Sequence, residues 1–528
     1  MPLDTLPYPA TLTSDFATTA TTNGSSPGTS PQAVALLSRA LGDRYALLQI
    51  PNHTVRLTHL DTADWRLRRA GIDLLWSSDP QELVASSSGS EPLRQPVGPI
   101  RWPALPTDLP DGPVRELVAG PIGIRALIGF ATSRSVSAGF DVLNEDHKTV
   151  TRVRWWDVRV EAPVESSLRP RIGVERLRGY AAQAADLERR LLSADSVSAP
   201  AQNWLDDFWA VAGIGPTQTQ RFGMLRDQAA DLAVADALLG YLATMEGTVD
   251  GIVADVDTEF LHDFRVAVRR TRSVLKLLGD VLPEGTAERI GSEFRWLGDV
   301  TTPTRDLDVY LLDFDDLAAT VSRPHDLQPL ADHLAKQRAA AHRALKRSLL
   351  SKRFSDLCRS WRTELGAIIS APTHHALTAA KLADHRLHRT YRKVTKRARA
   401  INAASPSEEI HALRKTCKEM RYLLDVFKPL CDPQAYRKVI ADFKQLQDIL
   451  GDFQDGEVQA NALHAFAAAM LADQSADANA ILAMGELSGR FDARQRAARE
   501  TLTAHHDEYL GERAAAHVDR LVSAGSRV

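Results

Sequence analysis

HDFRVAVRRTRSVLK (residues 262–276) carries basic side chains at steps of three, four, three and four residues: His262, Arg265, Arg269, Arg272 and Lys276. At about 100° per helical residue, these positions fall within roughly 80° of arc. The opposite side is apolar: Phe264, Val268, Thr271, Leu275 and Leu278. The stretch therefore predicts a helix with one face for a core and one cationic face, here called the basic stripe. For a single helix, the ordinary explanation of such a stripe is a solvated surface.

An internal repeat argues against that explanation. A shift of 149 residues aligns these pairs: His262 with His411, Arg265 with Arg414, Arg269 with Lys418, Arg272 with Arg421, Phe294 with Phe443, and Asp306 with Asp455. A solvated face has no reason to keep its charges in register, so the stripes predict a binding function. Each copy has room for about four helices joined by short loops. We therefore expect two four-helix bundles related by a pseudo-twofold axis.

Segregated charge suggests the kind of ligand. The net charge of the 528 residues is only −3, yet residues 336–353 and 381–400 are also strongly basic. Arginine offers a rigid fork of donors for phosphate oxygens, and lysine adds a mobile charge. A ladder of such groups along helices matches a flexible polyanion. The sequence has no GxxxxGK[ST] and no GxGxxG motif, so it does not predict a nucleotide site.

Composition divides the chain into four parts. Residues 1–32 are rich in Thr, Ser and Pro and predict a disordered leader. Residues 33–193 show short strand-like patterns and a final helix, and residues 194–219 predict a linker. Residues 220–525 have helical periodicity, with repeats at about 220–368 and 369–525 and breaks at LPEG, TTPT, SAPT and KPLCDP.

Three features of the sequence bear on its location. Cys358, Cys417 and Cys431 form no CxxC and cannot all pair, which suits a reducing compartment. No run of about 18 apolar residues predicts a membrane span, and the first basic residue is Arg39, so we expect no signal peptide. These features together predict a cytoplasmic protein. The sequence leaves its oligomeric state open.

With both stripes in view, residues 220–525 resemble the CHAD family, the conserved-histidine α-helical domain. The matching segments are HDFRVAVRRTRSVLKLL, WLGDVTTPTRDLDVYL and SKRFSDL in the first repeat, and HALRKTCKEMRYLLDVF and LQDILGDFQDGEV in the second. The resemblance implies two antiparallel four-helix bundles around a basic cavity that binds inorganic polyphosphate, and an association with polyphosphate granules. Two positions depart from the family: TTPT replaces a Leu-Gly turn, and Glu419 stands where the first repeat has Arg270.

The resemblance also implies a set of polyphosphate ligands: His262, Arg265, Arg269, Arg272, His411, Arg414, Lys418 and Arg421. Neighbouring basic positions complete the candidate site: Arg270, Lys276, Arg338, His342, Lys346, Arg389, Arg392, Lys393, Lys396 and Lys415. A metal site is not expected, because the cationic neighbours of both histidines oppose a dication. We expect Asp306 and Asp455 to orient arginine side chains and Cys417 to lie in the core.

Residues 33–193 are similar to a degenerate CYTH domain, a tunnel-shaped antiparallel β-barrel. The similarity is carried by VRLTHLDTADWRLRRAGIDLLW, which matches a strand, an Asp-Thr turn, a helix and a strand, and by TVTRVRWWDVRVE. Active members of that family carry Glu-x-Glu-x-Lys in the first strand. Here the first glutamate is Glu82 and no ExE pair occurs. A two-metal phosphoryl site needs clustered carboxylates, so we expect no catalysis and no cofactor.

The leading hypothesis is thus a non-enzymatic polyphosphate-binding protein. One alternative is a triphosphatase or nucleotidyl cyclase activity in the N-terminal domain. The other is a nucleic-acid-binding module, because basic grooves bind any phosphate chain. Tyr391 and Tyr422 are the main candidates for stacking on bases.

Overall fold

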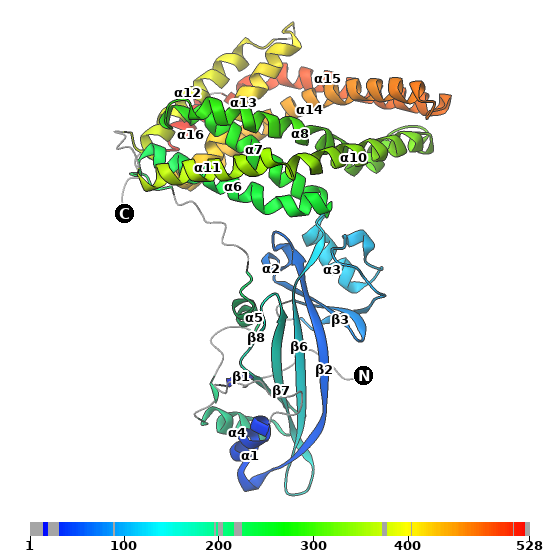
Figure 1. The fold of residues 1–528 in the computed structure, drawn as a ribbon, viewed down its shortest axis with the longest axis vertical. Helices are drawn as coiled ribbons and strands as arrows, with labels where there is room; N and C mark the ends of the chain where they lie inside the picture. Colours follow the sequence, from blue (N-terminus) through cyan, green and yellow to red (C-terminus); the bar gives the residue numbers. More distant parts are fainter. Residues whose placement is uncertain are drawn as a thin grey trace. The chain divides into compact units, whose positions relative to one another are not determined.

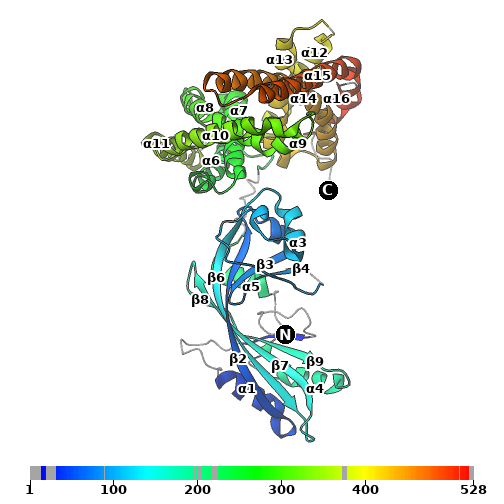
Figure 2. The same cartoon turned by 90° about the vertical axis from the view of Figure 1, so that its right-hand side faces the viewer.

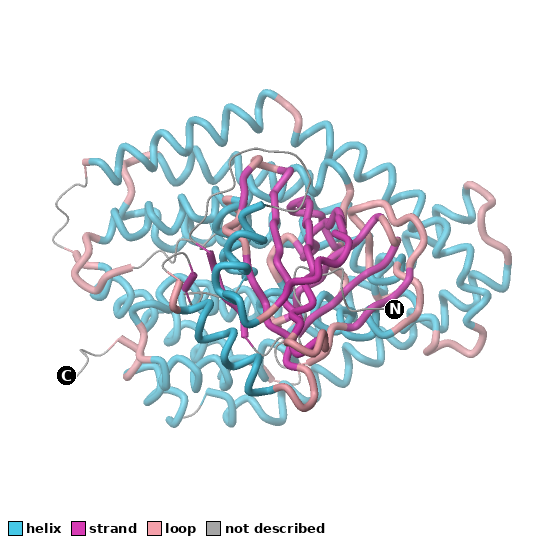
Figure 3. Tube along the Cα trace, turned by 90° about the horizontal axis from the view of Figure 1, so that it is seen from below, coloured by secondary structure: helices cyan, strands magenta, loops and turns pink. Residues whose placement is uncertain are grey.

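The computed structural model describes residues 14–18, 31–87, 90–194, 197–198, 204–215, 224–371, 377–402, 404–510 and 512–522. The chain forms two compact units, Met1–Thr219 and Gln220–Val528, here called the sheet unit and the helical unit. All named strands of the described residues belong to the sheet unit (Figure 3). The predicted combination of an antiparallel sheet region with an all-helical region is confirmed. Most of the predicted leader, residues 1–32, lies outside the described residues.

The sheet unit contains one antiparallel sheet of ten strands. In chain order they are β1 (Ser14–Thr18), β2 (Ala46–Thr62), β3 (Ile72–Ser78), β4 (Gln81–Ser87), β5 (Leu93–Pro96), β6 (Leu127–Leu143), β7 (Thr149–Ala162), β8 (Ser166–Ser167), β9 (Arg171–Arg176) and β10 (Val197–Ser198). Their spatial order is β10-β1-β9-β7-β6-β2-β3-β4-β5, with β8 beside β7. The long strands β2, β6 and β7 run side by side through a curved sheet (Figure 2).

The sheet does not close into the expected tunnel. Its two ends, β10 and β5, are short and do not pair with each other among the described residues. β1, which lies within the segment expected to be a disordered leader, instead pairs with β9 and β10. The expected strand–turn–helix–strand order is present as β2, α2 (Arg66–Arg69) and β3. The Asp61 carboxylate makes that turn by accepting hydrogen bonds from the backbone N–H groups of Thr62, Leu67 and Arg68.

Helices cover separate parts of the sheet. They are α1 (Pro31–Leu41), α3 (Pro113–Ile122), α4 (Ala181–Leu192) and α5 (Trp204–Ala212), with short 3₁₀ helices η1 (Gly42–Arg44) and η2 (Pro106–Asp108). α1 and α4 share a core with β6, β7 and β9 that includes Trp155. The expectation that residues 194–219 form only a linker is corrected by α5. Its Trp204, Phe208 and Trp209 are buried beside Val158 and Val160 of β7, because three large aromatic rings bury much apolar area.

The described residues of the helical unit form helices joined by turns (Figure 1), as the 3.6-residue periodicity of the sequence predicts. In chain order its helices are α6 (Ala230–Ala254), α7 (Thr258–Leu278), η3 (Gly279–Val281), α8 (Thr286–Leu312), α9 (Phe314–Ala318), η4 (Pro324–Leu327), α10 (Gln328–Leu349), α11 (Lys352–Ser370), α12 (Ala379–Ala400), α13 (Ser407–Phe427), η5 (Lys428–Leu430), α14 (Pro433–Ala472), α15 (Ala478–Leu510) and α16 (Glu512–Asp519). α7 packs on α6, α8 and α13, and α13 packs on α12 and α14.

The helices reproduce the repeat seen in the sequence. Thr258–Leu278 shifted by 149 residues becomes Ser407–Phe427, so α7 and α13 are equivalent from end to end. The 3₁₀ turns η3 and η5 that follow them are equivalent by the same shift. The apolar face also keeps its register: Phe264, Val268, Leu275 and Leu278 of α7 are buried, as are Leu413, Cys417, Leu424 and Phe427 of α13. The basic stripes therefore lie on equivalent, non-core faces of two equivalent helices.

TTPT is not the predicted break. α8 continues through residues 301–304, with Pro303 inside it. Proline removes one backbone donor and normally kinks a helix. Here the hydroxyl groups of Thr301 and Thr302 donate to the carbonyl oxygens of Leu297 and Gly298 at 2.7 and 2.8 Å. Arg265 of α7 then donates to both hydroxyls, each at 2.9 Å. These side-chain bonds support the helix around the proline.

α6 (Ala230–Ala254) bears on the prediction of no membrane span. Among the described helices, α6 is long and apolar enough to cross a membrane by length and composition. Half of the most apolar 18-residue stretch of α6 is buried within the fold, and α6 packs on α7 and α11. A core helix of a bundle has the same properties.

Candidate functional site

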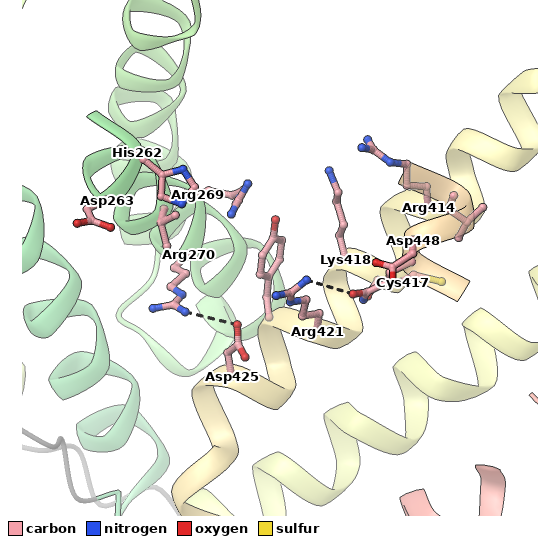
Figure 4. A pocket seen from close by; sticks show the side chains of 14 residues that line it. His262, Asp263, Arg269, Arg270, Arg414, Cys417, Lys418, Arg421, Asp425 and Asp448 are labelled. Atoms are coloured by element: carbon pink, nitrogen blue, oxygen red, sulfur yellow. Dashed lines mark hydrogen bonds and ion pairs between the residues drawn. The ribbon is translucent and has the colours of Figure 1, made fainter. Parts of the chain in front are cut away.

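Two cavities lie where α7 meets α13. The first has a volume of about 550 Å³ and is lined by His262, Asp263, Val266, Arg269, Arg270, Arg414, Cys417, Lys418, Arg421, Tyr422, Asp425, Gln447, Asp448 and Leu450 (Figure 4). The second has a volume of about 790 Å³ and is lined by Arg269, Arg272, Ser273, Leu275, Lys276, Leu277, Ala287, Glu288, Gly291, Arg295, His411, Arg414, Lys415, Lys418, Glu419, Tyr422 and Gln454. In both linings the Arg and Lys side chains outnumber the carboxylates.

Each cavity combines the first half of one of the helices α7 and α13 with the second half of the other. The first takes His262 from the start of α7 and Arg421 from the end of α13. The second takes the equivalent pair, His411 from the start of α13 and Arg272 from the end of α7. Each repeat thus contributes side chains to each cavity. This exchange is what a twofold relation between the repeats requires.

Four residues line both cavities and form what we call the central cluster: Arg269, Arg414, Lys418 and Tyr422. Arg269 and Lys418 occupy equivalent positions in the two repeats. The Arg269 guanidinium lies over the Tyr422 ring, 5.6 Å from its centroid, which is cation–π geometry. Lys418 points into the space between Arg269 and Arg414 (Figure 4). Burial and the nearby Arg414 and Arg269 guanidinium groups lower the pKa of Lys418 to about 8.

Two ion pairs cross between α7 and α13, and in both of them the cation is on α7 and the carboxylate is on α13. Arg270 of α7 lies 3.6 Å from Asp425 of α13. The equivalent positions are Glu419 of α13 and Lys276 of α7, whose nitrogen and oxygen atoms lie 2.7 Å apart. Glu419 also pairs with Lys393 of α12 at 3.3 Å. In the second repeat, Glu419 stands at the position of Arg270, and Asp425 stands at the position of Lys276. Because both positions change from a cation to a carboxylate, each cavity keeps one ion pair between the repeats.

This pairing predicts a stability effect that a second change should cancel. Glu419→Lys should lower the free energy of unfolding by about 2 kcal/mol, between the values typical of exposed and buried pairs. The reason is that Glu419 is largely buried while Lys276 is largely exposed, and the variant would face two lysines. Lys276→Glu combined with Glu419→Lys should recover most of the loss in urea denaturation. A double variant no more stable than Glu419→Lys would contradict this account of the pairs.

The two repeat-equivalent histidines have different partners. Arg305 of α8 lies 3.0 Å from Nδ1 of His262, and burial together with the Arg305 charge lowers the pKa of His262. A neutral ring that accepts from Arg305 at Nδ1 keeps its proton on Nε2, where it can be donated to an anion. His411 instead lies 3.0 Å from a carboxylate oxygen of Glu457. The histidines line the first and the second cavity respectively.

Arg265 and Arg414, another equivalent pair, also differ in position. Arg414 lines both cavities and lies 3.4 Å from Asp455, as expected for an aspartate that orients an arginine. Arg265 lines neither cavity and donates to the Thr301 and Thr302 hydroxyls of α8. The Asp306 carboxyl lies near Arg265, and its burial raises its pKa. The structure therefore gives Arg265 a supporting role in the scaffold.

The remaining predicted ligands are not brought into the cavities. Arg338 is held by Asp308 at 2.8 Å and by Asp255, and His342 shares a hydrogen bond with the carbonyl oxygen of Ile252 at 2.7 Å. The others lie on exposed surfaces of α10 and α12: Lys346, Arg389, Arg392, Lys393 and Lys396. Lys393 forms an ion pair with Glu419, which lines the second cavity. A run of basic residues on a helix thus did not by itself indicate the cavity.

Several cavity residues were not selected from the sequence. Arg295 of α8 lines the second cavity, and the repeat offers a signal for it, because the equivalent residue is Lys444. Gln447 accepts a hydrogen bond from Arg421 at 3.3 Å. Its equivalent is Gly298, where a Cβ atom would lie 2.7 Å from the Arg272 guanidinium. The two equivalent arginines are therefore accommodated differently: Arg421 has a side-chain acceptor in Gln447, and Arg272 occupies the space left by the missing side chain of Gly298.

Neither metal nor thiol chemistry is indicated in the described part of the chain. Within it, no group of three or more His, Cys, Asp or Glu side chains could hold a metal ion. Cys417 lines the first cavity but is fully buried, and burial raises the pKa of its thiol to about 12. It belongs to the α13 core, as predicted.

Comparison with known proteins assigns the helical region to a family. The model of the CHAD domain matches residues 236–464. Residues 236–464 are a CHAD domain. Both cavities of the CHAD domain lie within this span, because their lining runs from His262 to Gln454.

Several proteins are similar to this chain. An uncharacterized protein of Mycobacterium tuberculosis strain H37Rv is 27% identical over 209 residues, which are 38% of this chain and 38% of that protein. The match thus spans well under half of that relative's length. The crystal structure of the CHAD domain from the plant Ricinus communis is 24% identical, with a TM-score of 0.48, and covers 56% of this chain and 97% of that chain. PptA from Streptomyces chartreusis is 15% identical, with a TM-score of 0.40, and covers 53% and 99% respectively.

Proposed function

We propose that the CHAD domain binds inorganic polyphosphate without chemical turnover, in the two cavities between α7 and α13. The observation that carries the proposal is the central cluster, which places Arg269, Arg414 and Lys418 in the lining of both cavities. Among the described residues, Lys418 has no hydrogen-bond or ion-pair partner. Cations gathered without matching anions repel one another. A polyanion in the cavities would remove that repulsion.

The extent of the cationic surface favours a chain over a small anion. His262 in the first cavity and Lys276 in the second are separated by 14 residues of α7, which is about 21 Å at 1.5 Å per residue. A linear phosphate chain can contact both cavities at once and gains from the linkage of its contacts. Orthophosphate can occupy one cluster at a time. Chain length should therefore control affinity.

A catalytic role for the sheet unit is not part of the proposal. The alternative was triphosphatase or cyclase chemistry there, which requires clustered carboxylates that hold metal ions. The sequence contains no ExE pair. Purified protein should release no phosphate from tripolyphosphate with Mg²⁺ or Mn²⁺, and metal-dependent release would overturn the non-enzymatic proposal.

Nucleic acid is the second candidate ligand, and the cavity lining disfavours it. Proteins that bind single strands usually stack bases on aromatic rings. Apart from His262 and His411, Tyr422 is the one aromatic side chain among the described cavity residues, and Arg269 already covers its ring. The other proposed stacking residue, Tyr391, is buried in α12.

Competition distinguishes the two ligands. Labelled polyphosphate bound to the full chain is titrated with unlabelled polyphosphate or with single-stranded DNA at matched ionic strength, and the two competitors are compared by their total phosphate concentration. Polyphosphate should displace the label at a concentration at least about tenfold lower, because it carries more charge per length and needs no stacking surface. Equal displacement by both competitors would refute specificity for polyphosphate.

A further inference from the structure

Lys418 combines features that the binding proposal does not use. Its amine lies in the lining of both cavities, between the Arg269 and Arg414 side chains. Within the described residues it has no acceptor or carboxylate partner. At the equivalent position the first repeat has Arg269, which cannot act as a nucleophile. The second repeat thus places the amine of Lys418, the one lysine of the described residues that lines both cavities, among guanidinium groups that can hold a phosphoryl group.

The surroundings of Lys418 favour its uncharged, nucleophilic form. Nearby cations and partial burial destabilise an ammonium group, a known means of activating lysine. The pKa of Lys418 is lowered to about 8 by burial and by Arg414 and Arg269, against about 10.4 for an ordinary lysine. At pH 8, roughly half of the Lys418 side chains are free amine, compared with well under about 1% for an ordinary lysine.

We propose that Lys418 is an acylation site for small acyl phosphates, whose phosphoryl group is held by Arg269 and Arg414 while the acyl carbon meets the amine. The amine nitrogen attacks the acyl carbon, a C–N bond forms, and the C–O bond to phosphate breaks. Phosphate leaves with the bonding electron pair, and the proton lost by nitrogen passes to it or to water. The products are an amide at Lys418 and inorganic phosphate, so no further reactant is needed.

Acylation would change the cavities where they meet. An amide removes one positive charge from the central cluster and adds bulk between Arg269 and Arg414. This consequence rests on the proposed polyphosphate function: a Lys418-acylated protein should bind polyphosphate more weakly, by roughly tenfold to a hundredfold for one lost charge-assisted phosphate contact. Acyl phosphate concentration would then set the affinity of the site for its polyanion.

The test uses acetyl phosphate and the full chain. The protein is incubated at pH 8, and peptide mass spectrometry follows acetylation at Lys418, at Lys352 and at Lys276. Lys352 is the exposed reference, and Lys276 is the cavity lysine paired with Glu419. Lys418 should react at least roughly tenfold faster than either. An excess of orthophosphate should slow Lys418 alone, because it competes for the guanidinium groups.

Two controls separate a phosphate-directed reaction from a merely reactive amine. With p-nitrophenyl acetate, which carries no phosphate, the preference for Lys418 should shrink. With Arg269→Gln, the preference should also fall while circular dichroism stays unchanged. Equal rates at Lys418 and Lys352 with acetyl phosphate would overturn the proposal, as would the same preference with both reagents. Selective acetylation in a protein that fails to bind polyphosphate would uphold the acylation site and reject only the proposed function.

Discussion

Polyphosphate binding should fall at least about a hundredfold in the variant Arg269→Glu with Lys418→Glu. These two side chains occupy equivalent positions and line both cavities, so polyphosphate bound in either cavity would lie near both substitutions. Each charge-assisted hydrogen bond contributes about 1.5–3 kcal/mol. Two such losses exceed the roughly 2.7 kcal/mol that a hundredfold change requires, before the repulsion of the new carboxylates is counted. Isothermal titration with long-chain polyphosphate measures the change.

The matched control is Arg347→Glu with Arg359→Glu. It changes the net charge by the same amount on exposed parts of α10 and α11 that line neither cavity. Its affinity should stay within about threefold of the original protein, because exposed distant charges are screened by salt. If both pairs weaken binding equally, the ligand is attracted by overall charge and the cavities are not its site. Arg265 is unsuitable for this test, because its bonds to Thr301 and Thr302 support α8.

Phe264→Asp should unfold the helical unit or lower its melting temperature severely. Phe264 is fully buried in α7, and its ring lies 6.1 Å from that of Phe354. Truncating a buried phenylalanine costs about 3–5 kcal/mol, and an unpaired buried carboxylate adds a desolvation penalty. Since the free energy of unfolding of a domain is only about 5–15 kcal/mol, this single change should remove most of it. Thermal denaturation followed by circular dichroism measures it.

Arg269→Asp provides the comparison on the same helix. It introduces the same side chain five residues along α7, on the exposed stripe. It should leave the helical content unchanged and the melting temperature within a few degrees. If Phe264→Asp were as stable as Arg269→Asp, the assignment of the two faces of α7 would be reversed. The apolar face would then have to be the ligand surface.

The repeat in the sequence was the most informative signal for the fold. A constant shift of 149 residues aligns α7 with α13 over their whole length, and the buried positions Phe264 and Leu413 with it. Local periodicity determines such helices, because each must bury one apolar face. Most residues of the two basic stripes line the two cavities for the same reason. The helix face that is not packed into the core remains available for a ligand.

Long-range pairing explains what the sequence could not supply. Arg338 lies in the strongly basic segment of residues 336–353, yet it is neutralised by Asp308 of α8 and by Asp255 at the end of α6. The sequence TTPT predicts a break in the helix, because the hydrogen bonds from Arg265 to the hydroxyl groups of Thr301 and Thr302 come from another helix. The pairing of Arg270 with Asp425 and of Lys276 with Glu419 depends on which parts of α7 and α13 meet, and a single sequence does not state that.

The most direct measurement of the central claim is a calorimetric titration of the full chain with orthophosphate, tripolyphosphate and longer polyphosphates, at matched total phosphate and ionic strength. A chain that reaches both cavities gains from linked contacts, so affinity should rise with length until the chain spans about 21 Å of α7 and then level off. The melting temperature should rise in parallel, since a hundredfold excess over Kd adds about 2.7 kcal/mol. Equal affinity for orthophosphate and long polyphosphate would contradict the claim that the two cavities act as one site.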